Sequence, residues 1–162
     1  MALKQDRSTL QTDISFFMNE AAERGGVASV GTAGSGASMD NGAAVVTYAA
    51  NASGVAPMGI LVNDMVDIDL TRQHINQYKD EVAKGGKVTL LTKGWVVTDQ
   101  IEGAVTNGTE LAYLGHSGKI AASKVIADDS SDGAGLVVGR FASKVDQNGF
   151  AKVFIDLPNT NV

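Results

Sequence analysis

Two groups of aspartates are the closest approach in this chain to a metal site. Residues 128–133 (DDSSDG) match the first half of a calcium-binding loop, but Gly139 occupies the twelfth position, where such loops need a bidentate glutamate. A second acidic group, within residues 64–69, lacks the glycine of the sharp turn. We therefore expect solvated loops at both places, with no bound metal and no cofactor.

The residues with the chemistry for catalysis do not complete any motif. The chain has two histidines, His74 and His116, and no cysteine, so three-histidine zinc sites and thiol chemistry are both excluded. Gly115–Gly118 (GHSG) resembles part of a nucleophile elbow, but a lysine stands in place of the closing glycine. Gly34–Gly36 starts like a dinucleotide-binding loop, with a methionine at the third glycine. The sequence predicts a protein that is not an enzyme.

Charge and hydropathy argue against three further classes: nucleic-acid-binding, membrane and secreted proteins. The chain carries 18 acidic and 13 basic residues, for a net charge of −5, without a run of Lys or Arg that would neutralise phosphates. No apolar stretch approaches the roughly 18 residues of a membrane span. The first residues are charged where a secretory signal would be apolar. We expect no nucleic-acid partner, no membrane, and synthesis in a cytoplasm.

The material for a hydrophobic core is thin. Only 5 Phe, 3 Tyr and 1 Trp are present against 19 Gly, so Ala, Val and Gly must fill space that large side chains fill elsewhere. We expect contacts with other subunits to supply part of the stability.

Two segments show the apolar spacing of amphipathic helices. Residues 8–24 place apolar side chains on one helical face and end at a Gly-Gly pair. A short extended arm stays open as the alternative, because residues 14–16 also alternate. Residues 71–84 show the same spacing and also end at a Gly-Gly pair. The sequence therefore predicts one or two short helices.

The rest of the pattern is typical of strands. Predicted strands cover Met58–Val66, Lys87–Thr98 with a bulge or bend at Gly94, Leu111–Leu114, Lys119–Ala122, Leu136–Val145 and Phe150–Leu157. The last two are joined by Asp146–Gly149, the best hairpin signal in the chain. In the final strand, alternate residues are apolar, which predicts one buried face.

These elements divide the chain in two. Residues 1–57 are predicted to form a partly irregular, glycine-rich N-terminal arm, and residues 58–162 a mainly β domain. The predicted fold is a small β-barrel or β-sandwich with one or two short helices behind that extended arm.

Several stretches, taken in order, resemble one family. They are PMGILVND (57–64), DLTRQH (69–74), NQYKDE (76–81), KGGKV (84–88), KGWVVT (93–98), AYLGHSG (112–118) and VGRF (138–141). Together they are similar to the capsid decoration proteins of tailed bacteriophages, also called cement or head-stabilising proteins.

The resemblance implies a structural role. Such proteins bind the outer surface of a capsid and cement neighbouring subunits of the major capsid protein, which stabilises the DNA-filled head. The expected partners are the major capsid protein and further copies of this chain, with a homotrimer favoured and a homodimer possible. The expected location is the virion, after synthesis in the host bacterial cytoplasm.

Four large side chains are predicted to anchor the capsid or subunit interface, because aromatic residues dominate binding hot spots: Phe16, Phe17, Met18 and Trp95. On this hypothesis, deletion of residues 1–26 abolishes capsid binding without unfolding the domain. Two alternatives remain open. One is a head fibre or knob that recognises a host glycan or receptor, and the more remote one is a small β-fold hydrolase.

Overall fold

The computed structural model describes residues 3–4, 11–31, 44–52, 54–64, 80–123 and 135–157. In chain order the elements are β1 (Leu3–Lys4), β2 (Gln11–Asp13), β3 (Phe17–Met18), β4 (Ala22–Glu23), β5 (Val27–Val30), β6 (Val45–Thr47), β7 (Pro57–Asp64), β8 (Glu81–Val82), β9 (Val88–Thr98), β10 (Ile101–Glu102), β11 (Leu111–Leu114), η1 (His116–Gly118), β12 (Ile120–Ala121), β13 (Val137–Phe141) and β14 (Ala151–Asp156). The protein is mainly β, which confirms the predicted class.

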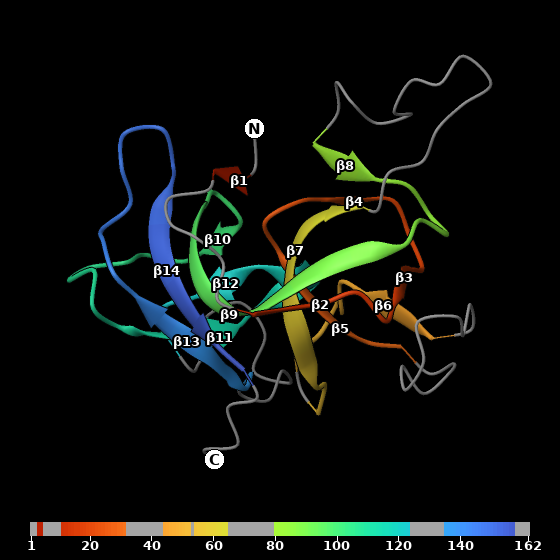
Figure 1. Ribbon diagram of the computed structural model, residues 1–162. Coiled ribbons are helices and arrows are strands. Elements are labelled where there is room, and N and C mark those ends of the chain that lie inside the picture. Colours follow the sequence, from red (N-terminus) through yellow and green to blue (C-terminus); the bar gives the residue numbers. More distant parts are fainter. Residues whose placement is uncertain are drawn as a thin grey trace.

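Twelve of the strands form one sheet (Figure 1). Its order is β10-β12-β11-β13-β14-β9-β7-β5-β6-β3, and β1 and β2 pair with β9 off this path. A separate pair joins β4 to β8. Figure 1 shows β11, β13 and β14 on one side of β9, and β5, β6 and β3 on the other.

The strands β5, β7 and β9, which we call the shared layer, are buried on both faces. Val27, Ile60 and Leu91 are paired in register across the three strands and belong to the larger hydrophobic core. Their chain neighbours Ala28, Leu61 and Leu90 belong to a second, smaller core. All six side chains are 0% exposed. Because successive strand residues point to opposite faces, this layer separates and supports two cores.

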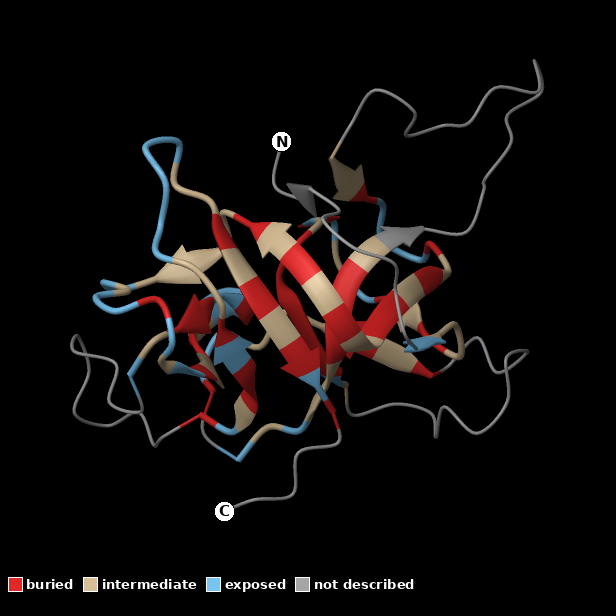
Figure 2. Ribbon diagram, turned by 60° about the vertical axis from the view of Figure 1, so that its left-hand side comes forward, coloured by how far each residue is buried: buried red, intermediate tan, exposed pale blue. Residues whose placement is uncertain are grey.

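Each core is completed by different strands. The larger core takes residues from β11, β12, β13, β14 and the second half of β9: Val96, Ala112, Leu114, Ile120, Val138, Phe141, Ala151, Val153 and Ile155. The smaller core takes residues from the N-terminal third and from β8 and the start of β9: Phe16, Met18, Ala22, Ala44, Val46, Val82 and Val88. Figure 2 shows the resulting alternation of buried and partly exposed residues along the central strands.

β9 holds the two halves together because it pairs with four strands. It has 11 residues, of which the first few pair with β7 and the last six with β14. Leu90 and Leu91 also pair with β2, and Val97 and Thr98 also pair with β1. Since a strand has two edges, β2 lies on the edge opposite β7, and β1 on the edge opposite β14. The N-terminal strands therefore cover an edge of β9 that the rest of the sheet leaves open.

The predicted helix over residues 8–24 is wrong. That segment forms β2, β3 and β4, and Phe16 and Met18 are buried on either side of the partly exposed Phe17. Burial with a period of two, driven by the smaller core, overrides the i, i+4 spacing. The second predicted helix lies outside the described residues over 71–79, and its end forms β8 as a strand.

The predicted division between residues 57 and 58 does not separate an arm from a domain. β5 and β6 lie in the main sheet, and β5 pairs directly with β7. Deletion of residues 1–26 would also remove Phe16, Met18 and Ala22 from the smaller core, so we now expect that deletion to destabilise the domain.

The predicted C-terminal hairpin is confirmed. β13 and β14 pair antiparallel from Gly139↔Ile155 to Phe141↔Val153. In the connecting turn, the Asp146 carboxylate accepts hydrogen bonds from the backbone N–H groups of Asn148 and Phe150, at 2.8 and 2.9 Å. Gly149 adopts a φ of 86°, which favours glycine at this position.

The irregularity expected at Gly94 occurs at Thr92 instead. Gly94 pairs with Ile155 in an unbroken ladder between β9 and β14. The register with β2 shifts at Thr92, because Gln11 pairs with Lys93 while Thr12 pairs with Leu91.

Among the residues that the structure describes, no helix has the length and apolar character needed to span a bilayer.

The shared layer predicts equal sensitivity at two adjacent leucines of β9. We expect Leu90→Ala and Leu91→Ala each to lower the free energy of unfolding by about 2–5 kcal/mol, because each leaves a cavity in a different core. Urea unfolding followed by far-UV circular dichroism and by Trp95 fluorescence should show one shared transition. As a matched control, Leu111→Ala truncates a leucine that is 51% exposed and should cost less. A loss confined to one of the two buried sites would contradict the two-faced layer.

Candidate interaction surface

A row of four large side chains crosses the solvent-facing side of β11, β13, β14 and β9. Leu111 pairs with Arg140, Arg140 with Phe154, and Phe154 with Trp95. Directly paired residues project from the same face of a sheet. Leu111 is 51% exposed, Arg140 is exposed, and Phe154 and Trp95 are partly exposed. We call these four residues the aromatic row.

The two rings of the aromatic row pack against each other. The ring centroids of Trp95 and Phe154 lie 4.8 Å apart, with the ring planes tilted by 49°. The opposite sides of both strands are held rigidly, because the neighbouring Val96, Val153 and Ile155 are buried in the larger core. The pair is thus a preformed aromatic platform. Its side chains lose little conformational entropy when a partner binds.

Charged residues surround the platform. In the paired row on one side, Lys93 forms an ion pair with Asp156, with an Nζ–Oδ1 distance of 3.2 Å and both side chains about half exposed. On the other side, Lys152 is paired with Val97. With Arg140, the described residues of this face include three cationic side chains and one carboxylate, although the whole chain has a net charge of −5. The face is a cationic area on an acidic protein.

The four predicted anchors do not lie together. Phe16 and Met18 are 4% and 1% exposed and form part of the smaller core, so they are corrected from surface anchors to core residues. Phe17 is partly exposed, with the Lys87 ammonium 5.4 Å from its ring centroid. Trp95 alone lies on the aromatic row. The alternation of a strand distinguishes the buried Phe16 and Met18 from the partly exposed Phe17. The predicted helix did not take this alternation into account.

A different site, at η1, contains the one described histidine. The His116 ring Nδ1 lies 2.9 Å from Glu102 Oε1, and the Glu102 Oε2 accepts the backbone N–H of His116 at 2.9 Å. Sequence spacing did not reveal this pair, because 14 residues separate its members and the contact arises when β10 pairs with β12. His74 lies outside the described residues.

The His116–Glu102 pair does not amount to a catalytic triad. No hydrogen bond joins the Ser117 hydroxyl to the ring among the residues that the structure describes. Ser117 has a left-handed backbone (φ 50°, ψ 39°), and Gly118 beside it packs so tightly that a Cβ would lie 2.7 Å from the Tyr48 ring. The geometry supports a tight structural corner in which Glu102 caps η1.

Tyr48 links this corner to the N-terminal strands. Its hydroxyl donates to the Glu23 carbonyl oxygen at 2.5 Å and accepts the backbone N–H of Gly26 at 3.1 Å. Burial of the phenol raises the pKa of Tyr48. The hydroxyl therefore remains protonated and can donate its hydrogen bond. Glu20 in turn accepts the backbone N–H of Tyr48 at 2.6 Å. The network fixes the turn between β4 and β5 against η1.

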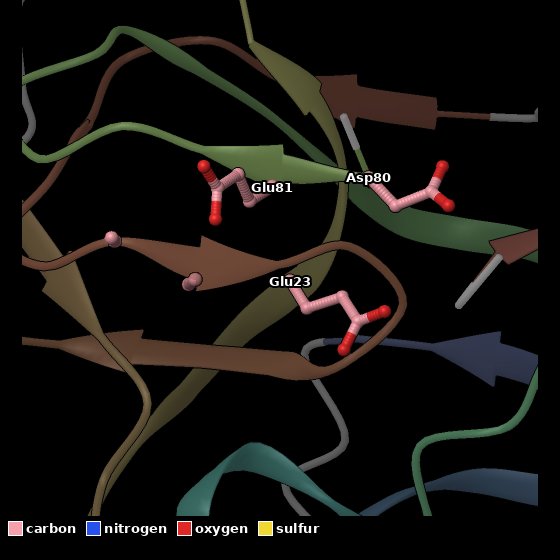
Figure 3. A pocket seen from close by; sticks show the side chains of 5 residues that line it. Glu23, Asp80 and Glu81 are labelled. Carbon is pink, nitrogen blue, oxygen red and sulfur yellow. The ribbon is translucent and has the colours of Figure 1, made fainter. Parts of the chain in front are cut away.

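An acidic pocket lies between β4 and β8. It has a volume of about 470 Å³ and is lined by Ala21, Ala22, Glu23, Asp80 and Glu81. In Figure 3 the side chain of Glu81 extends away from those of Glu23 and Asp80, so the three carboxylates do not converge on one point. Within the described ranges, no group of three or more potential ligands is arranged to hold a metal ion. The two predicted aspartate groups lie outside those ranges, apart from the backbone of Asp64.

Comparison with protein-family models gives no match, and comparison with curated proteins gives none. The aromatic row combines a rigid pair of aromatic rings with Arg140, and both aromatic residues and arginine are enriched in protein interfaces.

The ring packing of the aromatic row predicts an energetic coupling. In a double-mutant cycle of Trp95→Leu and Phe154→Leu, we expect a coupling of about 0.5–1.5 kcal/mol, because a tilted aromatic pair is worth that much beyond its buried area. Urea unfolding monitored by circular dichroism measures all four proteins of the cycle. Additive losses would show that the rings do not stabilise each other.

The hydrogen bonds at η1 predict that Glu102→Ala lowers the stability of the protein more than His116→Ala does. Glu102→Ala removes both hydrogen bonds to His116 and should lower the free energy of unfolding by about 1–3 kcal/mol. His116→Ala keeps the bond from the backbone N–H and should cost less. Thermal and urea unfolding of the two variants measure this difference. The reverse order would mean that the ring, and not the cap of η1, carries the stabilisation.

Proposed function

We propose that this protein is a capsid decoration protein, which binds the outer surface of a phage capsid and cements neighbouring subunits of the major capsid protein. The single observation that carries the proposal is the aromatic row, a rigid, partly apolar face on a small β-rich protein. Its shape and composition suit a protein partner better than a small substrate. The resemblance of the sequence to decoration proteins supports the same partner.

Charge supports the choice of face and suggests what it contacts. Arg140, Lys152 and Lys93 give the face positive character, while the chain as a whole is acidic. An acidic patch on the capsid exterior would match this face and would repel the rest of the protein, which fixes the orientation of docking. In this proposal the protein has the form of a small β-barrel or sandwich. The segment 1–57 adds strands to that domain and supplies further capsid contacts, and copies assemble as a homotrimer or homodimer.

A second candidate is a head knob that recognises a host glycan. A partly exposed tryptophan with polar neighbours, as at Trp95 beside the Lys93–Asp156 pair, also suits the apolar face of a sugar ring. Saturable binding of the purified protein to host cells, competed by free sugars, would favour this candidate. The hydrolase alternative is more remote, because the GHSG motif that contains His116 lacks the closing glycine of a nucleophile elbow.

Co-sedimentation with expanded, undecorated capsids tests the main proposal. We expect saturable binding of the full-length protein and improved survival of the capsids on heating. Arg140→Glu and Leu111→Glu should each weaken binding about tenfold or more, a loss of about 1.4 kcal/mol, because both side chains are exposed on the docking face.

Val145→Glu provides the matched control, since Val145 is 38% exposed in the connection between β13 and β14, outside both the aromatic row and the segment 1–57. Its binding should equal that of the unmodified protein. Equal weakening by all three substitutions would reject the aromatic row as the docking face. Absence of binding to any capsid form would reject the cement function itself.

A further inference from the structure

Within the part of the chain that the structure describes, β2 pairs with β9 and with no other strand. Gln11 and Thr12 are exposed and Asp13 is partly exposed, so no residue of β2 belongs to either core. Its contacts are the backbone pairing with Leu90, Leu91 and Lys93 of β9 and a hydrogen bond from the Thr92 hydroxyl to the Gln11 carbonyl, at 3.3 Å. Main-chain pairing is therefore the principal attachment of this strand.

The packing beside β2 is incomplete. A pocket of about 260 Å³ beside β2 is lined by Gln11, Asp13, Pro57, Met58, Thr92 and Leu157. The register break at Thr92 lies at the same place. A strand with no buried side chain and a gap beside it gains little from staying attached, so it opens at a low cost in free energy.

The edge of β9 that pairs with β2 would be open to other strands without it. β9 is rich in Val, Leu and Thr, and its edge opposite β7 has unpaired N–H and C=O groups whenever β2 leaves. A long, apolar, open strand edge is a template for pairing with another chain. The sequence that fits this edge, in register from Gln11↔Lys93 to Asp13↔Leu90, is the protein's own β2.

We propose that β2 is an exchangeable strand, and that the edge of β9 accepts β2 from a second copy of this chain. The second copy offers the identical sequence in the identical register, so reciprocal exchange conserves every contact and closes as a two-fold dimer. The pivot lies at residues 14–15, because Phe16 is fixed in the smaller core. This inference concerns contacts between copies and does not depend on the capsid role.

The hinge has a defined local structure. The Asp13 carboxylate accepts the backbone N–H of Ser15 at 2.7 Å, and Ile14 is partly exposed. From Phe16 to the far end of β2 the chain has five residues, which reach at most about 17 Å when extended, so the second copy must lie directly against this edge of β9. Exchange thus breaks the pairing of β2, and of β1 before it, with β9, and leaves the described residues of both cores in place.

Engineered cysteines test the exchange with little background, because the chain has no cysteine of its own. Full-length Gln11→Cys and Lys93→Cys proteins are mixed at several concentrations and oxidised gently. We expect a disulfide-linked heterodimer whose yield rises with concentration, detected by non-reducing electrophoresis and confirmed by mass spectrometry of the linked peptides. In the control mixture, Thr109→Cys replaces Gln11→Cys, since Thr109 is also exposed but lies outside β2.

The double variant Gln11→Cys/Lys93→Cys, oxidised at high dilution, shows whether the pair has disulfide geometry. We expect it to close an intrachain disulfide, and to lose that closure in favour of linked dimers as concentration rises. If the double variant closes but the mixture yields no more heterodimer than the control, β2 does not exchange. If the double variant does not close either, β2 does not pair with β9 as inferred. Either result overturns the proposal.

Discussion

The structure depends on one layer of three strands that is buried on both faces. Val27, Ile60 and Leu91 support the larger core, and their chain neighbours Ala28, Leu61 and Leu90 support the smaller one. Because both faces must be apolar, these strands lose the usual alternation of apolar and polar residues. Because the two cores share this layer, unfolding of either core would expose an apolar face of the layer. The N-terminal and C-terminal parts of the chain therefore fold as one body.

This constraint explains why β9 has so many partners. It carries residues of the smaller core at Val88 and Leu90, and residues of the larger core at Leu91 and Val96. The change of face coincides with the register break near Thr92, where the strand leaves β7 and joins β14. Beyond that point alternation resumes, and Lys93, Trp95 and Val97 face solvent. The aromatic row is thus a consequence of how β9 passes from one core to the other.

The correct and the incorrect predictions differ in the range of the interactions that decide them. The hairpin at Asp146–Gly149 and the alternation of β14 are local properties, and both were predictable. Residues 8–24 satisfied helical and strand patterns alike, and the choice was made by contacts of Phe16 and Met18 with residues more than 40 positions away. No window of local sequence contains that information. The same holds for the His116–Glu102 pair, which forms only after β10 and β12 are paired.

The sequence by itself determined the β-rich class, the long strand over 88–98 and the C-terminal hairpin, because turn chemistry and alternation act over a few residues. It also predicted Trp95, by residue type alone, as an anchor of an interaction surface, and that role stays a prediction. The tertiary structure decided which neighbours accompany Trp95, because Phe154, Arg140 and Leu111 reach the same face only through strand pairing in register. It also decided that Phe16 and Met18 lie inside, since a side chain is buried by the whole set of surfaces that pack around it and not by its own spacing.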